Sequence, residues 1–397
     1  MQIKKIIGKT AAVVLSAALL GLFGTAKYYS AKLPQTITCE STSGLKIAQY
    51  PEISLCTAET ETAELSLYGV IPVKKVELHQ SEPRTLIVGG HPFGIKLLME
   101  GVMVTALGKV EADCGTAVCP ASEAGIEIGD IVCSADGKEL TSNEQLQETI
   151  GKSNGKPIEL ELKRGGDTFT AVLKPVFSEV SQQWKGGMWV RDSIAGIGTM
   201  TFIDKATGRF AGLGHPICDS DTGEIVPVHS GEAVPVEITD TKRGESGNPG
   251  ELRGRFLAGQ SSGNLDLNNK FGVFGRMNDA AFSEISSQSE ELPLGFRHEV
   301  TTGAAEIYTT VSGDKPQCYS IEIESVDYDS TDSAKNMKIR ITDERLLEKS
   351  GGIVQGMSGS PVIQNGKLIG AVTHVFVKDS ACGFAVFADS MAEFTAE

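Results

Sequence analysis

A serine placed between two glycines near the C-terminus constrains this chain more than any other feature. Residues 356–361 read Gly-Met-Ser-Gly-Ser-Pro, so the backbone on either side of Ser358 is free to make a sharp, exposed turn. Such a turn lets the N–H groups of Gly356 and Ser358 point the same way, as an oxyanion hole requires. We therefore predict Ser358 as a nucleophile, with Gly356 and Ser358 as the backbone donors.

The residues that follow the serine exclude one common serine-hydrolase fold. Pro361 to Ile363, an Asn365-Gly366 turn and residues 368–375 predict a β-hairpin. The nucleophile elbow of an α/β-hydrolase needs a second glycine two residues after the serine, and then a helix. Here Ser360 takes that place and a hairpin follows, so the α/β-hydrolase fold is excluded.

Composition supports a mainly β protein and argues against several functions. The chain has 397 residues, 45 of them glycine, and only 6% are aromatic, which suits β-rich domains joined by tight turns. A formal net charge of −15 argues against nucleic acid as the main partner. We find no P-loop, no dinucleotide-binding glycine fingerprint and no His/Cys cluster with zinc-like spacing, so we expect neither a cofactor nor a metal.

The N-terminus predicts export. Three lysines among the first nine residues precede the uncharged stretch 10–26, and a basic start followed by an apolar run directs a chain across the cytoplasmic membrane. We assign 1–28 as a signal or anchor segment, and both a cleaved signal and a retained transmembrane helix remain open. Residues 29–72 follow as a polar linker with short β structure.

Residues 73–178 contain several short motifs: Phe93-Gly94-Ile95, the strand 101–104, Ala-Gly-Ile and Gly-Asp within 124–131, and the Asp136-Gly137 turn. Together these motifs resemble a PDZ domain of the kind found with bacterial proteases. The resemblance implies a β-sandwich with two helices. It also implies that Phe93, Gly94 and Ile95 expose backbone N–H groups to a peptide terminus, beside a groove in which a peptide adds as a strand.

From residue 179 to 397 the pattern is all-β, and a second chemical motif occurs. Strand 198–204, a glycine turn and strand 209–213 predict a hairpin that leads to His215. A histidine can take the proton of a serine hydroxyl as the serine attacks a carbonyl. We therefore predict His215 as the general base for Ser358.

These motifs together resemble a known family. The Gly-x-Ser-Gly-x-Pro hairpin is similar to the nucleophile segment of chymotrypsin-like serine peptidases. With the PDZ-like region, the Gly-His-Pro-Ile stretch 214–217 and the export segment, the chain resembles the stage IV sporulation protein B family of endospore-forming bacteria. The resemblance implies a double β-barrel and an exported serine endopeptidase.

The same resemblance implies a signalling role. It implies cleavage of a membrane-bound regulator of an intramembrane protease, which triggers sigma-factor processing in sporulation, together with self-cleavage. The place of action would be the forespore intermembrane space, with the chain anchored or released. Protein substrates and a PDZ ligand peptide are the implied partners.

The remaining site residues come from the same resemblance and from chain position. Asp343 stands just before the glycine-rich nucleophile segment, where the sporulation peptidases have their proposed acid, while Asp204 and Asp219 are competitors near His215. The strand after the nucleophile hairpin lines the substrate in chymotrypsin-like folds. The residues expected there are Thr373, His374 and Val375.

Two alternative functions and one disulfide stay open at this stage. A PDZ adaptor with an inactive peptidase fold carries the same motifs, and so does a general exported quality-control protease, although such enzymes place the PDZ domain after the peptidase. Cys114 and Cys119 are five residues apart and form either a bridge or two thiols.

Overall fold

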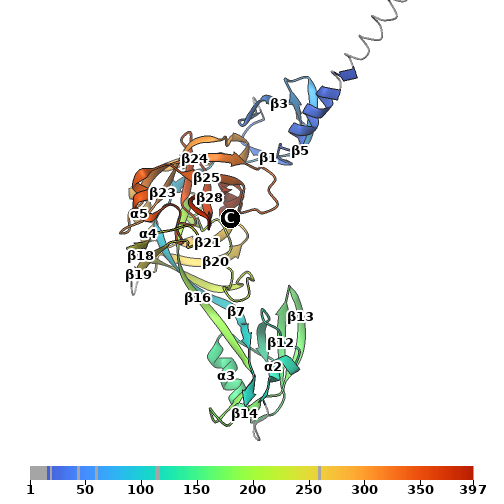
Figure 1. Ribbon diagram of the computed structural model, residues 1–397, viewed down its shortest axis with the longest axis vertical. Helices are drawn as coiled ribbons and strands as arrows, with labels where there is room; N and C mark the ends of the chain where they lie inside the picture. The colour runs from blue at the N-terminus through green and yellow to red at the C-terminus, as the bar shows by residue number, and fades with distance from the viewer. Residues whose placement is uncertain are drawn as a thin grey trace, which may run out of the picture.

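The computed structural model describes residues 16–17, 20–42, 45–58, 61–111, 117–257 and 261–396. The predicted mainly β fold is confirmed, with an N-terminal sheet, a PDZ domain and two β-barrels (Figure 1). The predicted signal or anchor segment and Cys114 lie largely or wholly outside the described residues. Residues 20–30 are helical, and no helix in the described ranges is both long and apolar enough to cross a bilayer.

The N-terminal region is a folded sheet, where the sequence suggested a linker. Its strands are β1 (Thr36–Cys39), β2 (Lys46–Ile47), β3 (Tyr50–Ala58), β4 (Thr62–Leu67) and β5 (Ile71–Gln80), in the order β1-β5-β4-β3-β2. Alternate residues such as Ala63 and Leu65 are buried, which gives the sheet an apolar face. This sheet extends to Gln80, beyond the boundary expected at residue 72.

Six strands pair in a ring to form the first barrel, in the order β7-β18-β20-β21-β17-β16 and back to β7. Their bounds are β7 (Pro92–Leu107), β16 (Met188–Asp204), β17 (Arg209–Gly212), β18 (Val228–Lys242), β20 (Gly263–Asn269) and β21 (Gly272–Met277). Flanking elements are β6 (Thr85–Val88), β19 (Glu251–Phe256), α4 (Asp279–Gln288) and β22 (Glu291–Pro293). Phe93 and Phe210 pack edge to face at its centre, with ring centroids 5.8 Å apart.

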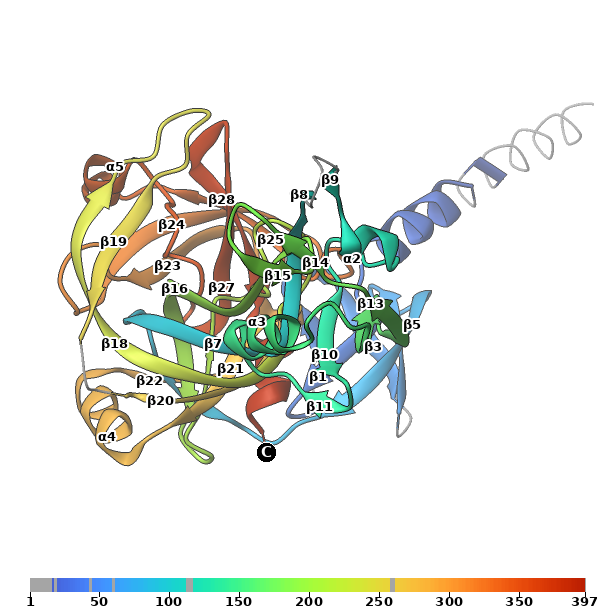
Figure 2. The same ribbon diagram turned by 90° about the horizontal axis from the view of Figure 1, so that it is seen from below.

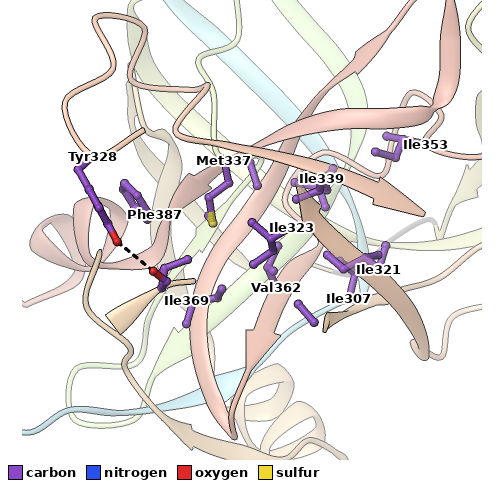
Figure 3. Close-up of a cluster of buried hydrophobic side chains, with 14 of the residues drawn as sticks. Ile307, Ile321, Ile323, Tyr328, Met337, Ile339, Ile353, Val362, Ile369 and Phe387 are labelled. Carbon is purple, nitrogen blue, oxygen red and sulfur yellow. Dashed lines mark hydrogen bonds between the residues drawn. The ribbon is translucent and has the colours of Figure 1, made fainter. Parts of the chain in front are cut away.

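The second barrel closes on itself in the order β23-β24-β25-β28-β27-β26. Its elements are β23 (Gly303–Thr309), β24 (Gln317–Val326), β25 (Met337–Ile341), α5 (Glu344–Ser350), β26 (Pro361–Gln364), β27 (Lys367–Phe376) and β28 (Asp379–Phe387). Short helices follow or precede it at η2 (Arg297–Glu299), α6 (Ala388–Ala392) and η3 (Glu393–Thr395). Aliphatic side chains such as Ile323 and Ile339 fill it, and the Tyr328 hydroxyl donates to the carbonyl of Val300 at 3.0 Å (Figure 3).

The PDZ domain is inserted into the first barrel. Its elements are β8 (Val110–Glu111), β9 (Ala117–Val118), α2 (Pro120–Glu123), β10 (Ile131–Ala135), β11 (Lys138–Glu139), α3 (Asn143–Lys152), β12 (Ile158–Arg164), β13 (Asp167–Leu173), β14 (Val176–Ser178) and β15 (Gln183–Lys185). Two long strands, β7 and β16, run side by side from the barrel into this domain (Figures 1 and 2). The predicted Asp136-Gly137 hairpin joins β10 to β11.

The domain boundaries of the structure differ from those expected at residues 73 and 178. Strand β6 and the first half of β7 pair with barrel strands β16 and β18, so residues 85–100 belong to the barrel. At the other end, Met188 to Arg191 of β16 pair with Leu107 to Met103 of β7 and complete the PDZ sheet. The PDZ domain therefore begins near Gly101 and takes its last strand from β16.

The assignment of Phe93, Gly94 and Ile95 as the peptide-binding loop is corrected by the structure. All three lie inside β7, where Gly94 is paired with Ile197 of β16 on one side and with Val234 of β18 on the other. Phe93 and Ile95 are only 2% and 3% exposed. A buried strand with partners on both edges has no free N–H groups for a ligand.

Candidate active site

His215 and Ser358 come together at a cavity between the two barrels. His215 follows β17 of the first barrel by three residues, and Ser358 precedes β26 of the second barrel by three. Both line one cavity of about 420 Å³. Packing of the two barrels therefore brings together two side chains that stand far apart in the sequence, each on a rigid framework.

The turn that carries Ser358 has the backbone that its glycines predicted. Gly356 and Gly359 have φ angles of +97° and +96°, a region in which residues with a Cβ are strained. A Cβ on Gly359 would also lie 1.9 Å from the carbonyl oxygen of Thr199. Met357, between them, is fully buried among apolar residues, as its thioether side chain favours.

The two predicted oxyanion donors are free in the described structure. The N–H of Met357 donates to the carbonyl of Val354 at 3.1 Å, and the N–H of Gly359 donates to Val372 at 2.7 Å. The N–H groups of Gly356 and Ser358 donate to no group among the described residues. Two unpaired N–H groups beside a serine hydroxyl are the arrangement that stabilises a carbonyl oxygen as it gains negative charge.

Strand β16 of the first barrel holds the nucleophile turn in place. The N–H of Thr199 donates to the carbonyl of Ser358 at 2.9 Å, and its hydroxyl donates to the carbonyl of Gly356 at 2.8 Å. Thr199 is buried and both bonds reach across the barrel interface. Sequence analysis missed Thr199, because only the packing of the barrels places it there.

The two serines of the motif have different partners. The hydroxyl of Ser358 is half-buried and donates to the carbonyl of Thr373 at 2.8 Å. The hydroxyl of Ser360 is buried, donates to Met357 at 2.6 Å and lies 2.9 Å from the Thr309 hydroxyl. Ser358 is therefore the accessible hydroxyl and Ser360 supports the turn.

A backbone carbonyl orients His215. Its Nδ1 lies 2.8 Å from the carbonyl oxygen of Pro216. Because a carbonyl only accepts hydrogen bonds, Nδ1 carries the proton and Nε2 is left as the base. Burial lowers the pKa of His215 below its usual 6.5, against the opposing effect of the Pro216 carbonyl, so the ring is neutral at pH 7.

His374 was expected to line the substrate, and it does line the cavity. Its ring also packs against His215, with centroids 4.9 Å apart and planes inclined by 37°. His374 is exposed overall, yet loss of water on its inner side, with further contributions from His215 and Lys335, lowers its pKa to about 4. It lies in a bulge of β27 together with Thr373, a feature often found next to active sites.

The assignment of Asp343 as the orienting acid is corrected by the structure. Asp343 caps α5, accepting from the N–H of Arg345 at 3.0 Å, and its carboxylate pairs with the Arg345 guanidinium at 2.8 Å. The Arg345 hydrogen bond is the main cause that lowers the pKa of Asp343 to about 2. The carboxylate of Asp343 therefore caps the N-terminus of α5 and binds Arg345, and it does not contact His215 in the described structure.

Asp204 and Asp219, the two alternative candidates for the orienting acid, also form ion pairs with arginines. Asp204 pairs with Arg84, and Asp219 pairs with Arg191 while accepting from two backbone N–H groups of its own turn. Within the described ranges no carboxylate forms an ion pair or hydrogen bond with His215. In the described structure the partner of the His215 Nδ1 atom is therefore the Pro216 carbonyl.

A second cavity, of about 820 Å³, lies on the PDZ domain between α3 and the segment Gln183 to Val190. Leu146, Trp184 and Trp189 give it apolar walls, and Trp189 is 61% exposed. Among the described residues, the N–H groups of Gly186 and Gly187 donate to no acceptor. This groove, rather than Phe93 to Ile95, has the free backbone donors of a peptide site.

These features define the class of the protein. A double β-barrel in which a glycine-flanked serine, a histidine and two free backbone N–H groups meet at the barrel interface is typical of a serine peptidase, here with an inserted PDZ domain. Residues 182–392 match the SpoIVB peptidase S55 family, and residues 116–174 match a PDZ domain. The chain belongs to the SpoIVB peptidase S55 family, as the sequence resemblance predicted.

Three similar proteins each match a short segment of this chain. The chain is 37% identical over 60 residues to a candidate zinc metalloprotease of Clostridium perfringens, covering 15% of this chain and 18% of that protein. It is 34% identical over 79 residues to another from Bartonella henselae, covering 20% and 22%. The PDZ domain of an SdrC-like protein from Listeria monocytogenes matches 23% of this chain and 87% of its own, with 21% identity and a TM-score of 0.19. The chain thus spans about a fifth of each metalloprotease.

Proposed function

We propose that this chain is an exported signalling endopeptidase that cuts a membrane-bound regulator of an intramembrane protease and also cuts itself. The single observation that carries the catalytic part is the nucleophile turn: Ser358 shares a cavity with His215, and the N–H groups of Gly356 and Ser358 are free. Membership of the SpoIVB peptidase family supports the sporulation role. The basic, apolar N-terminal sequence supports export.

The geometry supports the following reaction. A peptide carbonyl enters with its oxygen between the N–H groups of Gly356 and Ser358, and the Ser358 hydroxyl turns from Thr373 to Nε2 of His215. The oxygen of Ser358 bonds to the carbonyl carbon as His215 takes the proton, and His215 then gives that proton to the leaving amine. Water, activated by the same histidine, releases the acyl group and restores the serine.

The carbonyl of Pro216 has one main role in this reaction. It keeps the proton of His215 on Nδ1 in the resting state and accepts from the same N–H when the ring becomes positively charged. A carbonyl stabilises that charge less than a carboxylate would. We therefore expect a slow, selective enzyme, which suits a signalling protease more than a degradative one.

We place the chain in the space between the forespore membranes, held by residues 10–26 or released after cleavage. The PDZ groove beside Trp189 would take a C-terminus or extended segment of the regulator or of a second copy of this chain. Because Met357 is buried without any ionic partner, the oxyanion hole does not depend on a newly formed N-terminus. Self-cleavage would then govern release or lifetime.

The test is intact mass spectrometry of the purified full chain, before and after incubation in vesicles with its regulator. Wild type and Ser360→Ala should cut both themselves and the regulator, whereas Ser358→Ala should cut neither. If wild type and Ser358→Ala leave the same masses, the chain is a PDZ adaptor. If wild type degrades unfolded control proteins as fast as the regulator, it is a general quality-control protease.

A further inference from the structure

The cavity that holds Ser358 and His215 has an aliphatic wall. The side chains that form most of it share this character and come from both barrels: Ile194, Ile197, Leu213, Ile353, Val354 and Val375. The lining contains no Asp, Glu, Lys or Arg among the described residues. The polar groups present are largely those of the catalytic site itself.

Position relative to the oxyanion donors identifies which substrate residue this wall meets. A carbonyl oxygen held between the N–H groups of Gly356 and Ser358 places the α-carbon of its own residue beside the nucleophile turn. Val354 comes two residues before Gly356, and Val375 comes two residues after Thr373, whose carbonyl contacts Ser358. Both valines therefore line the cavity near the point where the carbonyl of the cleaved bond would bind.

The two charged residues that influence His374 pair with each other. Lys335 and Asp332, which influence His374, pair with each other at 2.6 Å and lie outside the cavity lining. A lysine or aspartate side chain entering the cavity would lose water and gain no partner there. An aliphatic side chain would instead bury apolar surface against apolar surface.

We infer that this peptidase selects an aliphatic residue, such as leucine or valine, on the carbonyl side of the bond that it cuts, and that Val354 and Val375 set this preference. The inference rests on the proposed peptidase reaction and narrows its substrate class. A wall that discriminates by size and polarity separates leucine from a charged residue by about 100-fold or more in kcat/KM.

The test compares phosphonate diesters with one peptide backbone that differ only in the side chain at this position, leucine or lysine. The oxygen of Ser358 bonds to phosphorus, phenoxide leaves, and the serine proton passes through His215 to the phenoxide. Intact mass of the full chain measures the labelling rate. We expect the leucine probe to label about 100-fold faster than the lysine probe.

A Val375→Asp variant sharpens the test. It should slow the leucine probe and speed the lysine probe, which changes their ratio at least 10-fold, whereas Val172→Asp, at a half-exposed valine on β13, should leave the ratio unchanged. Equal labelling of wild type by both probes overturns the aliphatic preference while the peptidase function stands. No labelling of Ser358 by either probe overturns the peptidase function itself.

Discussion

The two barrels have the same number of strands but relate differently to the rest of the chain. The second barrel closes on itself and supplies the nucleophile turn, while the first extends β7 and β16 into the PDZ domain and supplies His215. The glycines next to Ser358 determine the conformation of the nucleophile turn locally. The position of His215 depends instead on the first barrel, whose long strands β7, β16 and β18 pair between residues far apart in the sequence. The predictions below ask how far this difference holds.

The largest expected effect is at His215, the contribution of the first barrel to the reaction. His215→Ala should lower kcat by about 1,000-fold or more, because His215 is the histidine whose Nδ1 is held by the Pro216 carbonyl, while His374, with a pKa of about 4, is a weak base. Cleavage of an apolar peptide, followed by mass spectrometry, measures this loss. His229→Ala, at an exposed histidine of β18, is the matched control and should retain full activity. A His215→Ala variant that keeps a tenth of the activity contradicts the assignment.

The next effect concerns the stability of the first barrel. A Cβ on Gly94 would lie 2.6 Å from Val234 and 2.8 Å from Phe256, so Gly94→Ala should cost about 1–3 kcal/mol of unfolding free energy through overpacking. Urea unfolding measures this cost, and Gly151→Ala in α3, with open space around it, should cost nothing. If Gly94→Ala keeps its stability but loses peptide binding, Gly94 belongs to a ligand loop after all.

A pH profile of kcat/KM tests whether burial between the barrels lowers the pKa of His215. Because its pKa lies below 6.5, the ring loses its proton at a lower pH than a free histidine does. We expect kcat/KM to rise with pH and to reach half its plateau below pH 6.5, so that about 10-fold is lost roughly one unit below that midpoint. A midpoint at or above pH 7 would mean that a nearby negative charge dominates, as in a triad with an acid.

A smaller effect is expected where the two barrels touch through Thr199. Thr199→Val removes the hydroxyl that donates to Gly356 and keeps the side-chain shape, so kcat should fall by about 10-fold as the oxyanion turn loosens, with KM little changed. Thr201→Val is a matched control, since the buried Thr201 hydroxyl on the same strand has no partner among the described residues. Equal effects of both variants would remove Thr199 from the positioning of the turn.

The smallest effect is expected at Asp343 in the second barrel. Asp343→Asn should change kcat by less than about 3-fold, since its carboxylate caps α5 and pairs with Arg345. Its pKa is lowered from 3.8 to about 2, so any stability that it adds is present above pH 3.8 and is lost as the pH falls toward 2. Acid unfolding of wild type and Asp343→Asn, followed by circular dichroism, measures this contribution of Asp343 to stability. A 1,000-fold loss of kcat would restore Asp343 to the catalytic site.

Local turn chemistry made much of the second barrel predictable from the sequence. Gly356 and Gly359 have the positive φ angles that the motif predicted, and Asn365-Gly366 makes the hairpin turn with φ angles of +53° and +72°. Family resemblance identified the double barrel, the PDZ domain and the serine peptidase class. The order of His215 and Ser358 in the chain was enough to pair them.

Long-range pairing explains what the sequence could not predict. Phe93-Gly94-Ile95 has the same local pattern in a ligand loop and in a buried strand, and only its pairing with Ile197 and Val234 decides between them. Arg345, two residues after Asp343, was a visible competitor for the carboxylate, yet its role depends on the start of α5. The Pro216 carbonyl carries no sequence signal at all.

Strand β16 limits how the PDZ domain and the peptidase domain can be separated, both in evolution and in designed fragments of the chain. One unbroken strand borders the PDZ groove at Met188, lines the catalytic cavity at Ile197 and hydrogen-bonds the nucleophile turn at Thr199. A PDZ fragment ending at residue 178 would lack an edge strand, and a peptidase fragment starting at residue 179 would lack β7 from its barrel. Genetic exchange of this PDZ module therefore requires two cuts within strands, and its history should be tied to that of the peptidase.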